Sequence, residues 1–159
     1  MPAPPLILGE FSRTLDDRYR LSLPGELAEA FGESGDSILA KERRGCLSLW
    51  DASVWQARLE ANLELVRQKI GAGKLDNRLG QVQMLGRLLS TRHKPVRLTN
   101  RSRLVIPEGF REFLAVEPGG EVMLVGAAVC VEIWSPTAWL AYLQRRMPRF
   151  RRLFDELAG

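Results

Sequence analysis

The feature that most constrains the fold of this chain is an internal repeat that spans most of its length. The segment Arg20–Pro24 (RLSLP) aligns with Arg103–Pro107 (RLVIP), and the alignment continues after one inserted residue. The later matches are Gly35 with Gly119, Cys46 with Cys130, Trp50 with Trp134, Trp55 with Trp139 and Leu59 with Leu143. Tryptophan is rare, so two matched tryptophans at equal spacing indicate that both halves share one structural plan.

Each copy has the pattern of a small β unit. A strand, a polar turn, a second strand with alternating apolar residues, a proline-initiated helix and a hairpin follow in order. In the first copy the regular elements are predicted at 10–15, 21–23, 25–31, 37–40 and 47–50. In the second copy they are predicted at 96–98, 104–106, 108–114, 121–125 and 129–134. We therefore expect the two halves to fold alike.

The residues between the copies predict two helices. Apolar residues recur at helical spacing over 54–70 and again over 75–89, and Gly71-Ala72-Gly73 separates the two stripes. Such stripes are core surfaces far more often than cofactor sites, so we expect a helical hairpin packed on the sheet. Asp51 and Ser135 are the expected N-caps of the helices that follow the two hairpins, with Pro136 in the first turn of the second helix.

The size of one copy implies that the two copies pair. Four short strands and one short helix bury too little surface to be stable alone, and a tandem chain can make the pairing intramolecular. We predict an α+β, mainly β fold with one pseudo-symmetric body. The expected divisions are a first repeat at 6–53, a helical linker at 54–92, a second repeat at 93–137 and a basic amphipathic helix at 138–159.

Composition narrows the class of partner. The chain is 45% hydrophobic and 26% charged, as in globular proteins, and its net charge of +4 comes mainly from arginine, which suits phosphates and guanine edges. No apolar run reaches the roughly 18 residues of a membrane helix, and the first residues, MPAPP, lack the basic and apolar parts of a secretory signal. We expect a cytoplasmic protein without a membrane partner.

The chain offers little for metal or catalytic chemistry. Cys46 and Cys130 lie in strand-like apolar runs, where buried free thiols are expected rather than a disulfide or a zinc site. His93 is the lone histidine, and no Ser/His/Asp or Cys/His set accompanies it. We therefore expect a binding protein rather than an enzyme, with no catalytic residue, no metal, no cofactor and no small-molecule substrate.

Two segments carry a resemblance to a known family. Glu10–Pro24 (EFSRTLDDRYRLSLP) closely resembles the N-terminal signature of the MraZ family, and the W-x4-W spacing with Glu132–Pro136 (EIWSP) resembles the second half of that family. The resemblance covers roughly residues 6–141. It implies tandem SpoVT/AbrB-like units in a double-split, swapped-hairpin barrel. It also implies ring-shaped homo-oligomers that bind direct repeats in double-stranded DNA upstream of their own operon, in the cell-division and cell-wall gene cluster, and hence a nucleoid-associated protein.

The same resemblance assigns DNA contact to a D-x-x-x-R motif in each half. Asp16 and Arg20 form the first motif, whereas in the second copy Thr99 stands in place of the acid before Arg103. The family pattern has glycine just before the motif arginine, but this chain has Tyr19 and Ser102 there. A non-glycine residue in the left-handed region costs roughly 1–2 kcal/mol, so either the turn differs or packing offsets the cost. We interpret Tyr19 as an ordinary turn residue. The alternative interpretation is that its side chain contacts a sugar or a base.

Arginines recur in register around both turns, which favours an anion-binding surface. Asp16 is expected to orient Arg20, and phosphate contacts are expected to dominate. The predicted DNA-binding residues are Arg13, Asp16, Arg18, Arg20, Arg97, Arg101 and Arg103. Two alternatives remain: a solvated charged loop, whose exposed ion pairs contribute little, and a ring-forming scaffold or antitoxin-like partner protein with weak DNA binding.

The C-terminal segment is a second basic candidate surface. Arg145–Arg152 is rich in arginine, and Phe150, Leu153, Phe154 and Leu157 follow at helical spacing on one face. An apolar face of this kind needs a partner, and packing against a neighbouring subunit is the leading expectation.

Overall fold

A computed structural model describes residues 4–159. The first three residues of the MPAPP segment lie outside the described residues. The strands are β1 Glu10–Thr14, β2 Arg20–Ser22, β3 Asp36–Arg43, β4 Cys46–Asp51, β5 His93–Arg97, β6 Arg103–Val105, β7 Glu121–Gly126 and β8 Val131–Trp134. The helices are α1 Gly25–Ala28, α2 Ala52–Gly71, α3 Leu79–Arg92, α4 Glu108–Leu114, α5 Pro136–Arg146 and α6 Phe150–Ala158, with short 3-10 turns at Asp76–Arg78 and Met147–Arg149.

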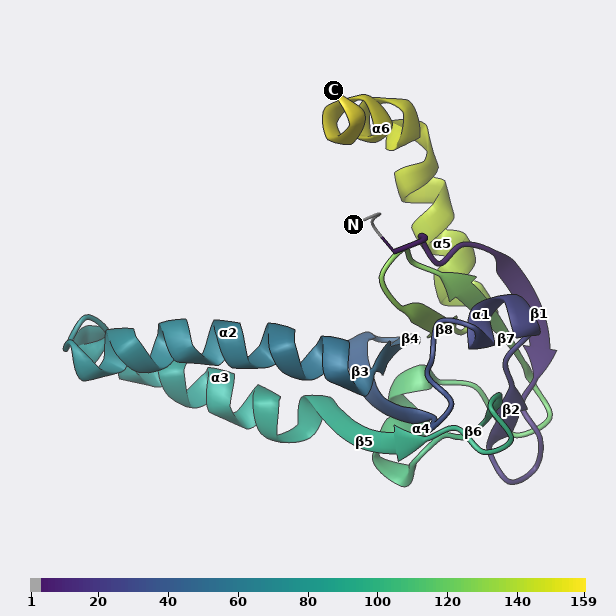
Figure 1. The fold of residues 1–159 in the computed structure, drawn as a ribbon, viewed down its shortest axis with the longest axis horizontal. Coiled ribbons are helices and arrows are strands. Elements are labelled where there is room, and N and C mark those ends of the chain that lie inside the picture. The colour runs from purple at the N-terminus through teal and green to yellow at the C-terminus, as the bar shows by residue number, and fades with distance from the viewer. Residues whose placement is uncertain (1–3) are drawn as a thin grey trace.

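The two copies exchange strands. Six antiparallel strands form one sheet in the order β1-β7-β8-β4-β3-β5, and β2 pairs with β6 in a separate two-stranded sheet (Figure 1). The first strand of each copy adds to the hairpin of the other copy, since β1 pairs with β7 and β5 pairs with β3. The fold is thus α+β with an antiparallel sheet. The helices hold more residues than the strands, so "mainly β" describes the body but not the whole chain.

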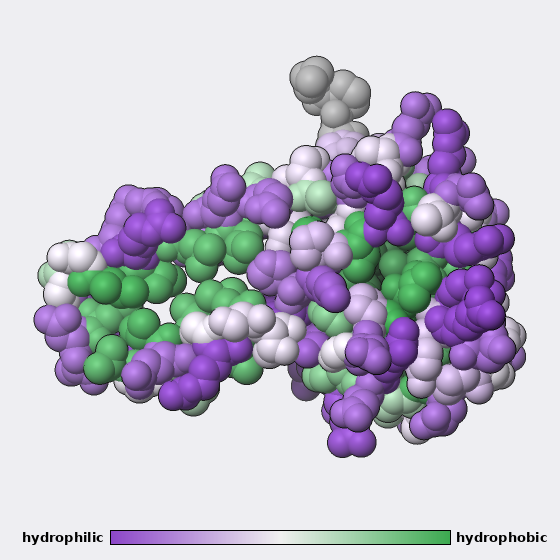
Figure 2. Space-filling view, turned by 90° about the horizontal axis from the view of Figure 1, so that it is seen from below, coloured by the Kyte–Doolittle hydropathy of each residue, from purple (hydrophilic) through white to green (hydrophobic). Residues whose placement is uncertain are grey.

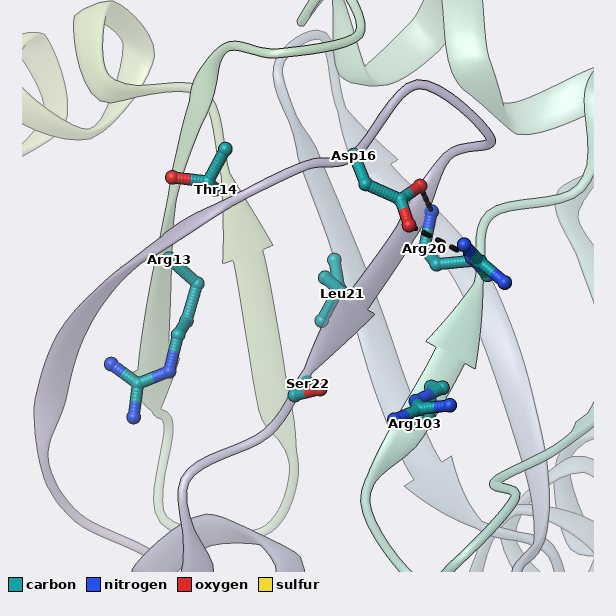
Figure 3. Close-up of a pocket in the computed structure, with 7 residues that line it drawn as sticks. All are labelled: Arg13, Thr14, Asp16, Arg20, Leu21, Ser22 and Arg103. Carbon is teal, nitrogen blue, oxygen red and sulfur yellow. Dashed lines mark hydrogen bonds and ion pairs between the residues drawn. The ribbon is translucent and has the colours of Figure 1, made fainter.

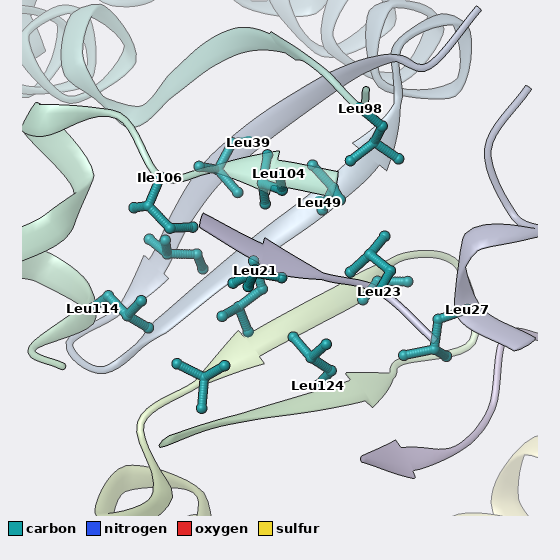
Figure 4. Packing of buried hydrophobic residues seen from close by; sticks show 14 of the residues in the cluster. Leu21, Leu23, Leu27, Leu39, Leu49, Leu98, Leu104, Ile106, Leu114 and Leu124 are labelled. Carbon is teal, nitrogen blue, oxygen red and sulfur yellow. The ribbon is translucent and has the colours of Figure 1, made fainter. Parts of the chain in front are cut away.

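Leucines from both copies form one core. Leu21 and Leu104 are paired across β2 and β6, and Leu39, Leu49 and Leu124 pack into the same cluster from the larger sheet (Figure 4). Because β1 pairs with β7 and β2 pairs with β6, and the core cluster draws on both copies, neither half buries these side chains without the other. The intramolecular pairing expected from the sequence is therefore present.

The repeated tryptophans occupy equivalent places. Trp50 and Trp134 end their hairpins, and each packs on the tryptophan five residues later, with ring centroids 5.6 Å apart for Trp50–Trp55 and 5.2 Å apart for Trp134–Trp139. The predicted caps are confirmed. Asp51 accepts hydrogen bonds from the first turn of α2, and the Ser135 hydroxyl accepts one from Ala138 N at 3.2 Å at the start of α5.

The predicted helical hairpin exists, but its expected packing on the sheet is wrong. α2 and α3 run side by side away from the sheet (Figure 1), and within 52–92 the one buried residue is Trp55, where α2 meets β4. The apolar stripes largely face each other along the hairpin. They leave a groove of about 280 Å³ between the helices and exposed hydrophobic side chains along them (Figure 2). Periodicity identified an apolar face correctly but did not reveal what covers it.

Several remaining sequence expectations concern single residues. Both cysteines are buried and unbonded, and burial raises both thiol pKa values, to about 12 for Cys130. His93 packs on Trp55 with ring centroids 5.3 Å apart, and its Nδ1 is buried without a partner among residues 4–159. No helix in that part of the chain is long and apolar enough to cross a membrane, nor do its His, Cys, Asp and Glu side chains gather into a metal-binding group.

Candidate nucleic-acid interface

The β1–β2 turn is organised by one carboxylate. Asp16 Oδ1 accepts hydrogen bonds from the backbone N–H groups of Arg18 at 2.8 Å and Arg20 at 2.9 Å, and Oδ2 accepts one from Arg20 Nε at 2.8 Å. The backbone N–H of Arg20 is the main cause of a lowered Asp16 pKa, and its guanidinium adds to the effect. An ionised carboxylate therefore fixes both the turn and the direction of the Arg20 side chain.

Tyr19 takes the left-handed conformation that the family pattern assigns to glycine. Its φ is 59°, so the turn itself is retained. The Arg111 guanidinium lies 4.1 Å from the centre of the Tyr19 ring, and the Tyr19 carbonyl accepts a hydrogen bond from Ile106 N at 2.8 Å. Cation–π and backbone contacts with the second copy thus oppose the conformational cost. They also hold the ring against its own chain, as expected of a turn residue.

The β5–β6 turn is built differently. Thr99 and Arg103 exchange two backbone hydrogen bonds of 2.9 Å, and positive φ values fall on Asn100 and Arg101 rather than on Ser102. Backbone pairing replaces the carboxylate, so the turn forms without an acid at Thr99. In the described part of the chain, Arg103 consequently forms no ion pair with an acid that would orient it.

Arginines from three strands line one depression of about 410 Å³, with Arg13 on one side and Arg20 and Arg103 on the other (Figure 3). Arg13 comes from β1, Arg20 from β2 and Arg103 from β6, and the depression is completed by Thr14, Asp16, Leu21 and Ser22 (Figure 3). Arg103 is paired with Ser22 across the two strands while the neighbouring Leu21–Leu104 pair is buried, which turns Arg20 and Arg103 outward on one face. Both copies therefore contribute cationic groups to one concave surface.

The other three predicted arginines lie outside this depression. Arg97 pairs with Asp36 at 2.9 Å and Arg101 with Glu33 at 3.3 Å, both exposed, whereas Arg18 is an exposed residue of the first turn. Within residues 4–159 neither Arg13 nor Arg103 forms an ion pair. Four of the seven predicted residues thus line the depression and three do not.

Sequence reasoning did not single out Thr14, Ser22 or Arg111. Ser22 follows Arg20 by two residues on an alternating strand, so the period of two was a usable signal for it. No local pattern indicates the contact of Arg111 with Tyr19, because the two residues come from different copies.

Comparisons with known proteins agree with the sequence motif. A family model described as "MraZ protein, putative antitoxin-like" matches residues 95–155. A curated relative from Thermus thermophilus named Transcriptional regulator MraZ is 31% identical over 133 residues, which cover 82% of this chain and 83% of that protein. The chain belongs to the MraZ family. A MraZ protein from Heliobacterium modesticaldum, also named a transcriptional regulator, is 27% identical over 152 residues and 96% of each chain.

Different comparisons match the two copies of the repeat to the MraZ family. The family model covers the second copy through α6, whereas the motif that first indicated MraZ lies in 10–24 of the first copy. The alignments with whole MraZ relatives span both. The family prediction made from the two motifs is confirmed.

Proposed function

We propose that this chain is a DNA-binding transcriptional regulator of the MraZ type. The observation that carries the proposal is the joining of Arg13, Arg20 and Arg103, from both copies, around one depression on the strand-exchanged body. The naming of its relatives as transcriptional regulators supports the regulatory role. Asp16 offsets one of the three guanidinium charges, so the lining stays net positive and attracts anions such as the phosphate groups of DNA.

The three arginines would act differently on DNA. Asp16 holds Arg20 through Nε, which leaves the terminal nitrogens of that guanidinium for a phosphate or a guanine edge. Within residues 4–159 Arg13 and Arg103 form no ion pair, so neither has an acidic partner to displace there. Arg97 and Arg101 already pair with Asp36 and Glu33, so we assign them and Arg18 a smaller share of binding.

The assembly and target are part of the same proposal. We assign the strand exchange to the swapped-hairpin barrel of SpoVT/AbrB-like units, with 6–53 and 93–137 acting as one DNA-binding body and 54–92 and 138–159 as its helical extensions. Modest base reading by each protomer would gain specificity when several protomers of a ring meet several direct repeats upstream of the chain's own operon. The exposed apolar faces of α3 and α6 support contacts between protomers.

A second candidate is a ring-forming scaffold or antitoxin-like partner protein. Two observations favour it: Thr99 leaves Arg103 without an orienting acid, and the pairing of Arg97 and Arg101 with acids reduces the positive field of the second turn. In this case DNA binding would be weak and insensitive to sequence.

Fluorescence anisotropy separates the two candidates. Purified protein is titrated against labelled DNA from upstream of its own gene and against a scrambled duplex at several salt concentrations. The regulator binds the upstream DNA more tightly, and the slope of log affinity against log salt reports how many phosphates are engaged. Equal, weak binding to both duplexes would reject the regulator in favour of the scaffold.

A further inference from the structure

A second basic cavity lies between the two C-terminal helices. Its volume is about 560 Å³, and it is lined by Tyr142 and Arg146 of α5, by Arg149, and by Arg152, Leu153 and Glu156 of α6. It shares no residue with the depression at the β1–β2 turn. The three arginines come from the end of α5, from the 3-10 turn Met147–Arg149 and from α6, and the bend of the chain between the two helices brings them to one cavity.

The charges of this cavity are only partly compensated. Arg152 pairs with Glu156 at 3.2 Å, but both side chains are largely exposed, so the pair is weak. Arg146 and Arg149 form no ion pair with any residue of 4–159. The lining is therefore net positive, and an anion between the arginines would relieve their mutual repulsion.

An aromatic platform fixes one wall. Tyr142 stacks on Trp139 with an interplanar angle of 12° and packs on Trp134 at 5.1 Å between ring centroids. Arg43, at the end of β3, lies 5.0 Å from the centre of the Tyr142 ring, and Arg146 lies 5.9 Å from it. Packing with the tyrosine ring reduces the freedom of the Arg146 guanidinium, which lines the cavity, so less entropy is lost when it binds an anion.

We infer that the cavity between α5 and α6 is a phosphate-binding site, in which Arg146 and Arg149 provide the main contacts and Arg152 a third. Planar guanidinium groups donate two parallel hydrogen bonds to phosphate oxygens, and three of them around one cavity suit a ligand with adjacent phosphate groups. The phosphates belong either to a free nucleotide or to the backbone of DNA. The assignment to DNA rests on the proposed function, whereas the assignment to a free nucleotide does not.

The test compares two double variants of the full chain with equal net charge. R146Q/R149Q removes two lining arginines, and R145Q/R151Q removes two exposed arginines of the same segment that do not line the cavity. Inorganic pyrophosphate is titrated by isothermal titration calorimetry. We expect saturable binding by the wild type and by R145Q/R151Q, and at least a roughly tenfold loss of affinity in R146Q/R149Q.

Duplex DNA then identifies the source of the phosphates. If R146Q/R149Q also binds duplex DNA more weakly than R145Q/R151Q does, with a smaller salt slope, the site holds the DNA backbone; unchanged DNA affinity assigns it to a free ligand. Equal losses in both variants, or no saturable pyrophosphate binding by the wild type, would overturn the inference. Failure of the proposed regulator would appear instead as equal binding of upstream and scrambled DNA, which leaves the pyrophosphate result unaffected.

Discussion

Leu104 tests whether the two copies share one core. Its side chain is fully buried, it is paired with Leu21 of the other copy, and it belongs to a cluster of buried residues from strands and helices of both copies. Leu→Ala substitutions in such sites cost about 2–5 kcal/mol, and limited collapse around the cavity favours about 3–4 kcal/mol for Leu104→Ala. For a chain of this length the melting temperature then falls by roughly 6–16 °C.

Urea unfolding followed by tryptophan fluorescence measures this cost, because Trp50 and Trp134 lie at the hairpins that enclose the core. Val105→Ala is the matched control, since Val105 is the next residue and is 48% exposed. We expect it to cost no more than about 1 kcal/mol. A loss below about 1 kcal/mol in Leu104→Ala, or equal losses in both variants, would refute a core shared between the copies.

Three further predictions concern burial and assembly. Burial raises the pKa of Glu132, so ionisation favours the unfolded chain; this penalty is absent below the ordinary carboxyl pKa and complete above the raised value. Glu132→Gln, which keeps an acceptor for Trp134 Nε1, should therefore raise the free energy of unfolding at pH 7 but not at about pH 3.5, and a loss at pH 7 would contradict this. Cys46 and Cys130 should react with a thiol reagent only after unfolding, and rapid labelling of the native protein would disprove their burial. Deletion of residues 148–159 should lower the oligomer mass in light scattering, and an unchanged mass would exclude α6 from the subunit interface.

The repeat made the body of the fold predictable. Residues matched between the copies, such as Trp50 with Trp134, occupy equivalent places because identical spacing imposes the same local structure and the same packing. Local signals also located the caps at Asp51 and Ser135. The presence and the order of the helices and strands can be predicted from such signals, because each signal lies among neighbouring residues of the sequence.

Features that depend on distant contacts were not predictable. Arg97 pairs with Asp36 and Arg101 pairs with Glu33, and these acids lie 61 and 68 residues away in sequence. No local sequence pattern could therefore indicate which of the predicted arginines are paired with acids. The direction of the α2–α3 hairpin likewise depends on which surface covers its apolar face. The sequence therefore predicted a set of arginines for the site. Which of these arginines come together depends on the exchange of strands between the two copies, and no local sequence pattern reveals that exchange.

The most direct test of the central claim compares two double variants by anisotropy on DNA from upstream of the gene. R20Q/R103Q removes the arginines that face the depression, and R97Q/R101Q removes the same net charge from arginines already paired with acids. We predict that R20Q/R103Q loses at least about tenfold in affinity and about two units of salt slope, and that R97Q/R101Q loses much less. The unfolding midpoint of R20Q/R103Q should stay nearly unchanged, because the Arg20–Asp16 pair is partly exposed. Equal affinity losses in the two variants, or tight binding by R20Q/R103Q, would contradict the assignment of this depression to DNA.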